Sequence, residues 1–114
     1  MPYIQSKLSI VLSEEQKSTL QKKLLDIVVS STSKPKNFVM TNIEDNQDIW
    51  MSDTKIDKSA YIEISLLGSV SKQTCGIITK EICDFLQEEY LIDGKYVYVS
   101  FHPLDLWGWN GQMF

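Results

Sequence analysis

The sequence predicts an α/β protein of the two-layer α+β type, in which two helices cover one face of a four-stranded mixed sheet. The first observation is that two helical patterns are each flanked by segments in which apolar and polar residues alternate. The second is that a shift of 58 positions superimposes the two patterns and places Ser13 on Ser71. We therefore predict one domain, 1–114, built from two copies of a β-α-β unit, residues 2–44 and 60–102.

The composition is that of an ordinary globular protein, with 43% hydrophobic and 23% charged residues. The net charge of -4 argues against a nucleic-acid partner. All 11 basic residues are lysines, so the bidentate contacts that arginine makes with phosphate or carboxylate are absent. The single histidine, His102, leaves too few ligands for a histidine metal site, and it has no assigned role. We therefore expect no metal.

The first unit opens with a predicted strand over residues 3–10, where apolar residues recur on one face. A helix follows from Ser13, because Ser13 and Gln16 have the spacing of a capping box. The helix carries one apolar stripe, which consists of Leu20, Leu24, Ile27 and Val28. It is predicted to end near Ser31, ahead of a Lys-Pro pair, and a second strand is predicted over 38–44.

The segment 45–59 between the units is acidic and polar. It lacks the glycine of an EF-hand loop, so it is predicted to be a solvated loop rather than a calcium site. The second unit then repeats the first, with strands over 60–67 and 96–102 and a helix that opens near Ser71. The apolar stripe of this helix consists of Ile78, Ile82, Phe85 and Leu86. Right-handed crossovers make the two strands of each unit parallel.

No predicted helix remains to cover the second face of the sheet. That face is too aromatic for a simple solvent face and too polar for another helix layer. Its aromatic and apolar residues are Tyr3, Phe38, Met40, Tyr61, Tyr96 and Tyr98. A subunit interface with a polar interior accounts for this composition, so we expect an oligomer.

The location expected from the sequence is the cytoplasm. Cys75 and Cys83 lie eight residues apart in a helical pattern, which is roughly 12 Å along the axis and too far for a disulfide. No segment approaches the ~20 apolar residues of a membrane span, so membrane insertion is not expected. The first residues also lack the basic and apolar regions of a signal peptide.

The tail, residues 105–114, is predicted to form a hairpin, because an Asn-Gly pair favours a two-residue turn. Trp107, Trp109 and Phe114 are too many apolar rings for a free chain end. We therefore expect these rings to pack on the body of the protein or to line a pocket.

Four features follow one another in order along the chain. They are Pro2 after Met1, Lys34-Pro35 after the first helix, Val97-Tyr98-Val99 in the last strand, and Trp107-Gly108-Trp109-Asn110-Gly111 in the tail. This ordered set resembles the macrophage migration inhibitory factor family of tautomerases over the full length. The resemblance implies a homotrimer whose sheets enclose a central channel, with active sites at the subunit boundaries. It also implies keto–enol tautomerisation of phenylpyruvate-like and dopachrome-like substrates, with no cofactor.

The resemblance further implies roles for individual residues. Pro2 matches the catalytic N-terminal proline, Lys34 the substrate-binding lysine, and Leu67 an aliphatic residue of the pocket. Tyr98 matches the pocket tyrosine that a neighbouring chain supplies, and Ser100 stands where many members carry asparagine. The positions that wall the pocket are matched by Phe38, Trp107, Trp109 and Phe114.

Two departures from the family pattern bear on function. The Cys-x-x-Cys of the vertebrate cytokine falls on Ser59 and Ile62, so thiol-oxidoreductase activity is not expected. An arginine that the cytokine uses in receptor recognition falls on Leu12. A cytokine-like protein exported without a leader, with an extracellular receptor and a vestigial pocket, remains an alternative, as does a trimeric ligand-binding scaffold. Export of that kind leaves no mark in a sequence.

Tautomerisation needs a base that is neutral near pH 7 and a group that stabilises enolate charge. An α-amino group has a reference pKa near ~7.7–8.0, and burial or a neighbouring cation lowers it. An N-terminal Pro2 among aromatic rings, with Lys34 beside it, would meet both conditions. The nitrogen is a free amine only after Met1 has been removed, because an X-Pro peptide nitrogen is delocalised into the carbonyl. Lys34 would also attract the substrate carboxylate and the developing enolate oxygen.

Overall fold

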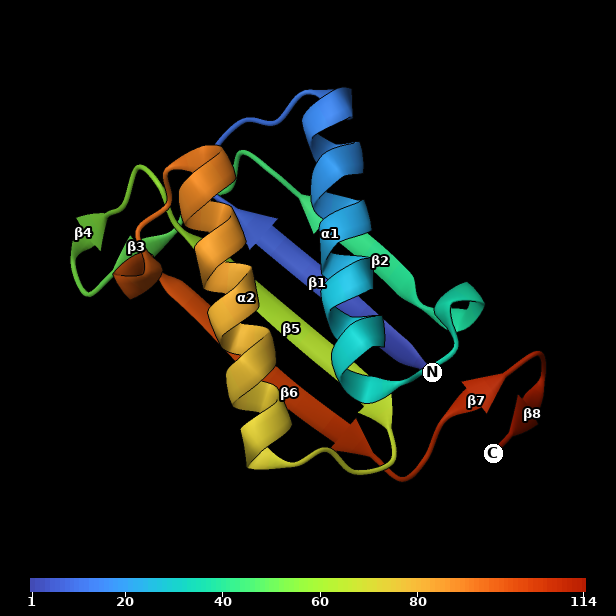
Figure 1. The fold of residues 1–114 in the computed structure, drawn as a ribbon. Helices are drawn as coiled ribbons and strands as arrows, with labels where there is room; N and C mark the ends of the chain where they lie inside the picture. Colours follow the sequence, from blue (N-terminus) through green and yellow to red (C-terminus); the bar gives the residue numbers. More distant parts are fainter.

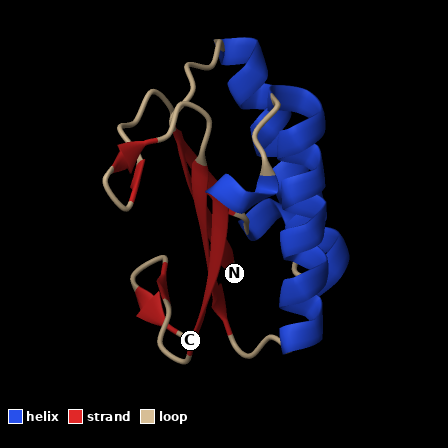
Figure 2. Cartoon of the chain, turned by 90° about the vertical axis from the view of Figure 1, so that its left-hand side faces the viewer, coloured by secondary structure: helices blue, strands red, loops and turns tan.

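Two long helices lie on one face of a four-stranded sheet in the computed structural model, which describes residues 1–114 (Figures 1 and 2). The sheet strands are β1 (Pro2–Leu8), β2 (Met40–Glu44), β5 (Ala60–Leu67) and β6 (Val97–Leu104), and the helices are α1 (Glu14–Thr32) and α2 (Lys72–Tyr90). The strand order is β2-β1-β5-β6. Strands β1 and β2 are parallel, as are β5 and β6, whereas β1 and β5 are antiparallel. The predicted mixed two-layer fold is confirmed.

The helix ends follow from local sequence. Ser13 accepts a hydrogen bond from the Gln16 amide, and the Gln16 side chain binds the Ser13 amide, which completes the predicted capping box. Helix α1 ends one residue later than predicted, at a left-handed Ser33 with φ 56°. The same offset of 58 relates this residue to Leu91, which ends α2 in the left-handed region with φ 58°. Ser71 caps α2 by accepting from the Thr74 amide.

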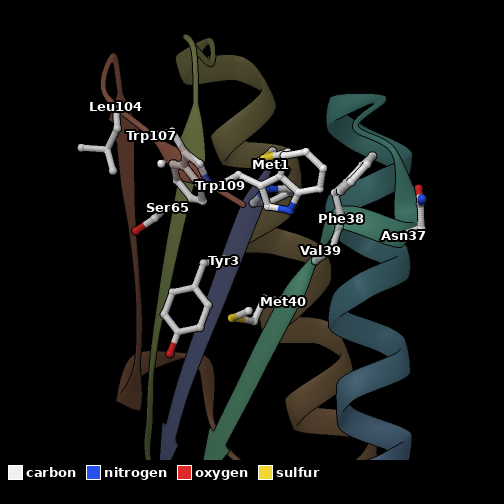
Figure 3. Close-up of a pocket in the computed structure, with 12 residues that line it drawn as sticks. Met1, Tyr3, Asn37, Phe38, Val39, Met40, Ser65, Leu104, Trp107 and Trp109 are labelled. Atoms are coloured by element: carbon white, nitrogen blue, oxygen red, sulfur yellow. The ribbon is translucent and has the colours of Figure 1, made fainter. Parts of the chain in front are cut away.

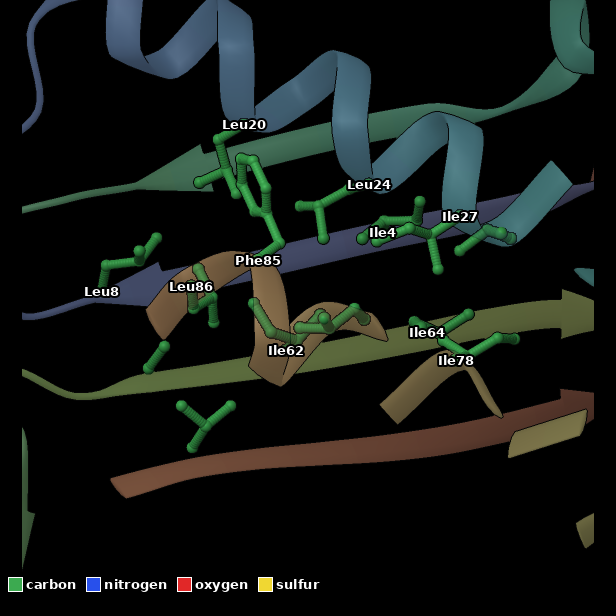
Figure 4. Close-up of a cluster of buried hydrophobic side chains, with 14 of the residues drawn as sticks. Ile4, Leu8, Leu20, Leu24, Ile27, Ile62, Ile64, Ile78, Phe85 and Leu86 are labelled. Carbon is green, nitrogen blue, oxygen red and sulfur yellow. The ribbon is translucent and has the colours of Figure 1, made fainter. Parts of the chain in front are cut away.

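The core lies between the helices and the sheet (Figure 4). Alternate residues of β1 and β5 meet the apolar stripes of both helices, and all eight predicted stripe residues are buried. The buried hydrophobic cluster consists of Ile4, Leu8, Leu12, Leu20, Leu24, Ile27, Val28, Ala60, Ile62, Ile64, Leu66, Ile78, Ile82, Phe85, Leu86, Tyr90, Ile92 and Val97. Burial of this apolar surface is the main favourable term that holds the two layers together.

The face opposite the helices is open, as the edge-on view shows (Figure 2). Met40 and Tyr98 are exposed there, while Tyr3 and Tyr61 are half-buried. Two of the residues predicted for the strands of this face lie outside those strands. Phe38 and Tyr96 belong to short 3₁₀ helices, η1 (Lys36–Phe38) and η2 (Gly94–Tyr96), rather than to strands. At both places the backbone makes a tight turn before it enters the sheet. Residues 9 and 10 likewise lie outside β1.

The prediction of a loop over 45–59 is wrong in part. The segment contains a small hairpin of β3 (Trp50–Met51) and β4 (Thr54–Lys55), whose turn places Ser52 at φ 55°. Its start is anchored to the first unit. The Asp45 carboxylate accepts from the Leu12 amide at 2.8 Å, and this bond, together with nearby Lys17, lowers the pKa of Asp45.

The tail forms the predicted hairpin from β7 (Gly108–Trp109) and β8 (Gln112–Met113). Asn110 and Gly111 both have positive φ, 52° and 76°, which is the backbone geometry that an Asn-Gly turn supplies. Elsewhere in the fold, Cys75 and Cys83 are free thiols on α2, and burial raises the pKa of each. Neither helix is long and apolar enough to cross a membrane.

We expect Ile62→Ala to lower the free energy of unfolding by about 2–5 kcal/mol, because Ile62 is fully buried and a cavity would remain. The control Val11→Ala, at a side chain that is 71% exposed, should change it by less than about 0.5 kcal/mol. Denaturant titrations at one fixed chain concentration measure both values. Equal losses in the two variants would contradict the assignment of the core.

Candidate active site

A cavity of about 590 Å³ opens at the start of β1, beside the C-terminal tail (Figure 3). This volume lies in the range of small-molecule sites. Its lining residues are Met1, Pro2, Tyr3, Asn37, Phe38, Val39, Met40, Ser65, Leu104, Trp107, Gly108 and Trp109. Four of the nine residues assigned to the pocket from the sequence, Pro2, Phe38, Trp107 and Trp109, are therefore brought together in one chain.

Aromatic rings form one wall of the cavity. The rings of Phe38 and Trp109 meet edge to face with centroids 5.6 Å apart, and Phe114 stacks on Trp109 at 5.9 Å. The Phe114 amide also donates to the Trp107 carbonyl at 3.0 Å, which fixes the end of the hairpin. Phe114 thus supports the wall without lining the cavity. The rings offer an apolar surface against which a flat aromatic ligand can pack.

The start of the chain is held against the end of β5. Pro2 is buried and lies opposite Leu66 in the antiparallel ladder, and the Leu67 amide donates to the Met1 carbonyl at 3.3 Å. The Leu67 carbonyl in turn accepts from Lys34 Nζ at 3.0 Å. One residue of β5 thereby connects the N-terminus to the lysine that follows α1.

Gly68 permits the turn that follows β5. It has φ +97°, which an L side chain rarely adopts. The Gly68 amide donates to the Leu104 carbonyl at 2.9 Å, so the turn also joins β5 to the end of β6. Leu104 itself lines the cavity.

The terminal amine of Met1 is the basic group that borders this cavity. Among the lining residues, only the Met1 amine and the Tyr3 side chain can ionise, and the Tyr3 hydroxyl donates to Gln5. Partial burial, with the nearby Lys34 cation as a second cause, lowers the pKa of the Met1 amine below 8.0. A larger fraction of the amine is therefore neutral, and able to accept a proton, at pH 7.

Tyr98 lies towards the other end of the open face, and Ser100, which pairs with Glu63, lies near its middle. Tyr98 pairs with Tyr61 in the ladder, whereas Pro2 pairs with Leu66, so roughly 16 Å of strand separates the two positions. Tyr98 instead borders a shallow pocket with Lys7, Gln47, Asp48, Ile49, Trp50 and Tyr61. Ser100 is hydrogen-bonded to Tyr61 and His102. A single chain therefore leaves Tyr98 and Ser100 outside the cavity at Pro2.

Sequence reasoning missed several lining residues, among them Ser65 and Leu104. The antiparallel register of β1 and β5 places Ser65 opposite Tyr3. Alternation along residues 60–67 puts Ser65 on the open face, but that pattern alone does not reveal which end of a neighbouring strand it meets. Leu104 carries no chemical signal in the sequence.

A duplicated β-α-β sandwich of this topology is the fold of the tautomerase superfamily. Within it, the chain belongs to the macrophage migration inhibitory factor (MIF) family, whose sequence model matches residues 1–114. A comparison with curated proteins found no match.

Solved structures agree with this assignment. The chain is similar to MIF2 of Leishmania major, with a TM-score of 0.90 and 25% identity over 100% of this chain and 97% of that one. A macrophage migration inhibitory factor-like protein of Entamoeba histolytica has a TM-score of 0.87 and 23% identity over 99% and 98% of the chains. A fused 4-OT described as a symmetric trimer has a TM-score of 0.84 and 18% identity over 97% and 94%. The family and its fold support a tautomerase-type or MIF-like function.

We expect Lys34→Ala to raise the pKa of the terminal amine, in a chain that retains Met1, because it removes the neighbouring cation. Burial is the larger cause of the shift and remains, so the pKa should stay below 8.0. The pH dependence of acylation at residue 1, followed by peptide mass, measures this. Lys36→Ala is the control, since Lys36 pairs with Asp26 at 3.8 Å. An equal effect in both variants, or none in Lys34→Ala, would contradict the assignment.

Proposed function

We propose that this protein is a cofactor-free keto–enol tautomerase that acts on phenylpyruvate-like aromatic 2-keto acids, with the Pro2 amine as general base. The observation that carries the proposal is the position of the terminal amine at the cavity. The terminal nitrogen borders an apolar, aromatic cavity that holds no other side chain able to act as a base near neutral pH. Burial and the nearby Lys34 cation lower the pKa of the Met1 amine, and the same two causes would act on the Pro2 amine after Met1 is removed and favour the neutral form that a general base needs.

Removal of Met1 would complete the site in two ways. It converts the Pro2 nitrogen from a tertiary amide into a secondary amine, which can accept a proton. It also takes away the Met1 carbonyl, to which the Leu67 amide donates. That N–H would then be free to donate to an oxygen atom of the substrate, close to the new amine.

The proposed reaction moves one proton. The neutral amine takes a proton from C3 of the keto acid, charge develops on the keto oxygen, and the ammonium then returns a proton to that oxygen. The Lys34 ammonium, which lies beside the Leu67 carbonyl, provides positive charge for the carboxylate and the enolate oxygen. The rings of Phe38 and Trp109 suit the aryl group of phenylpyruvate-like or dopachrome-like substrates.

We further propose that Tyr98 and Ser100 act in a neighbouring subunit of a homotrimer. Neither residue lines the cavity of its own chain, and Tyr98 is 64% exposed on a sheet face that no helix covers. Packing of this face against other subunits would bury Tyr98, Met40 and Trp50. The trimeric structure among the similar folds supports a three-chain assembly. Each site would then combine Pro2 of one chain with Tyr98 and Ser100 of the next.

Tautomerase activity should depend on the removal of Met1. Intact-mass measurement gives the fraction of chains that retain Met1, and ultraviolet assay of phenylpyruvate ketonisation gives the rate. We expect the rate to fall in proportion to the Met1-retaining fraction, because a tertiary amide is no base. Undiminished turnover in a sample that retains Met1 throughout would mean that another group is the base.

Mixed assemblies test whether the site is shared. Pro2→Gly chains lack the proline base and Tyr98→Phe chains lack the tyrosine hydroxyl, so each homotrimer should be impaired. When the two are unfolded and refolded together, some sites combine Pro2 of one chain with Tyr98 of another. We expect partial recovery of activity in the mixture. No recovery in mixtures that sedimentation equilibrium confirms as trimers would contradict a site shared between chains.

A further inference from the structure

A chain of three hydrogen-bonding side chains crosses the open face of the sheet. The Tyr61 hydroxyl lies 2.9 Å from Ser100 Oγ, and Ser100 Oγ lies 2.9 Å from His102 Nε2. Tyr61 and Ser100 are half-buried, while His102 is exposed at the edge strand. His102 is the one histidine of the chain.

The register of β5 and β6 produces this arrangement. Ser100 and His102 are two residues apart on β6, so both side chains point to the open face. Tyr61 lies on β5, diagonally across from Ser100, whose direct partner in the ladder is Glu63. A long aromatic side chain can span such a diagonal, which a shorter residue could not.

The direction of the two hydrogen bonds depends on where the histidine carries its protons. A serine hydroxyl has one proton to donate and lone pairs with which to accept. A phenol is a stronger hydrogen-bond donor than an aliphatic hydroxyl. This favours donation from Tyr61 to Ser100 and from Ser100 to an unprotonated Nε2 of His102. A protonated His102 has hydrogen on both ring nitrogens, so Nε2 must donate to Ser100 instead. The Ser100 hydroxyl proton is then no longer hydrogen-bonded to the histidine and can be donated elsewhere.

We propose that His102 is a positioning residue that sets, by its own protonation, whether Ser100 offers a lone pair or a proton to an anionic ligand at the open face. When His102 is neutral, the Ser100 hydroxyl donates its proton to Nε2, so that only an oxygen lone pair of Ser100 faces a ligand carboxylate. When His102 is protonated, the Ser100 hydroxyl can donate to the carboxylate, and the positive charge of the imidazolium lies next to this hydrogen bond. The class of ligand is therefore a carboxylate, bound more tightly when His102 is protonated than when it is neutral. The ligand part of this inference rests on the proposed function, in which Ser100 faces a neighbouring site.

Other ionisable groups share this face and act on the same equilibrium. They are Tyr61 and Glu63 of β5, Tyr98 of β6, Tyr3 and Lys7 of β1, Glu44 of β2, and Asp105 just after β6. Glu63 forms no salt bridge and no side-chain hydrogen bond with the rest of the chain, and it pairs with Ser100 in the ladder. Glu44 accepts a hydrogen bond from Gln5, two strands away from β6. None of these groups is bonded to the histidine ring, whereas Ser100 is.

Nitrogen NMR of the single imidazole tests the relay without any substrate. At a pH where His102 is neutral, we expect its proton on Nδ1, because Nε2 accepts from Ser100. Ser100→Ala and Tyr61→Phe should both shift the population towards the Nε2–H tautomer. Ser65→Ala is the control, since Ser65 lies opposite His102 in the ladder without a bond to it, and it should leave the tautomer unchanged. A neutral His102 that is mainly Nε2–H, or one that ignores Ser100→Ala, overturns the proposal.

Binding of phenylacetate, a carboxylate that cannot tautomerise, tests the consequence for ligands. Tryptophan fluorescence can report Kd at about pH 6 and pH 8 for the wild type and for His102→Gln, which keeps a donor but never gains charge. We expect the tightening on acidification to be about tenfold greater in the wild type, the effect of one charge-assisted hydrogen bond. Protonation of the Pro2 amine affects both proteins alike. The neutral phenylacetamide is the control ligand and should show no such difference.

Equal pH dependence in the two proteins, or no phenylacetate binding at all, overturns the proposal. Turnover is measured separately from both readouts. A protein that shows the tautomer shift and the pH-dependent binding, yet converts no phenylpyruvate, supports this inference and contradicts the proposed function.

Discussion

The antiparallel pairing of β1 with β5 is the constraint on which the candidate site depends. It places Pro2 opposite Leu66 and brings the Leu67 amide to the Met1 carbonyl. The Leu67 carbonyl also accepts a hydrogen bond from Lys34 Nζ. This one strand pairing therefore positions both the N-terminus and the lysine next to it. The same pairing joins the two β-α-β units edge to edge and completes the surface on which the helices pack. A slip of one residue in this register would turn Pro2 and Ile4 away from the core.

The two units share a scaffold but differ in chemistry. The offset that relates the helix caps also relates Pro2 to Ala60 and Lys34 to Ile92. Both residues of the second unit are buried and apolar, and Ala60 is in mid-chain, with no free amine. The second unit contributes instead the strand β6, with Tyr98, Ser100 and His102 on the open face. A site that combines Pro2 with Tyr98 requires surfaces from two chains, because the ladder places Tyr98 five residues along β5 from the position of Pro2.

The failures of sequence reasoning have a common physical origin. Phe38 and Tyr96 continue the alternation of the strands they precede, yet both belong to 3₁₀ turns that redirect the chain into the sheet. The alternation indicates only which side chains face the core. A residue in a turn can direct its side chain to the core or away from it just as a strand residue does. The β3–β4 hairpin was missed because its strands have two residues each, too short to show any period. Its polar composition is equally typical of a solvated loop.

The sequence by itself determined the helices, their caps, the parallel strand pairs and the Asn-Gly hairpin. The helices, caps and hairpin depend on residues close together in the chain, and each parallel pair depends on the handedness of the crossover within one unit. Through the family resemblance it also pointed to Pro2, Lys34 and the tail tryptophans as candidate site residues. Only the tertiary structure decided which of them meet. The contact of Lys34 with Leu67, the wall of Phe38 against Trp109, and the hydrogen bonds of His102 through Ser100 to Tyr61 depend on strand register and loop path. Such contacts form between distant segments once the core has fixed the sheet, and local periodicity carries no record of them.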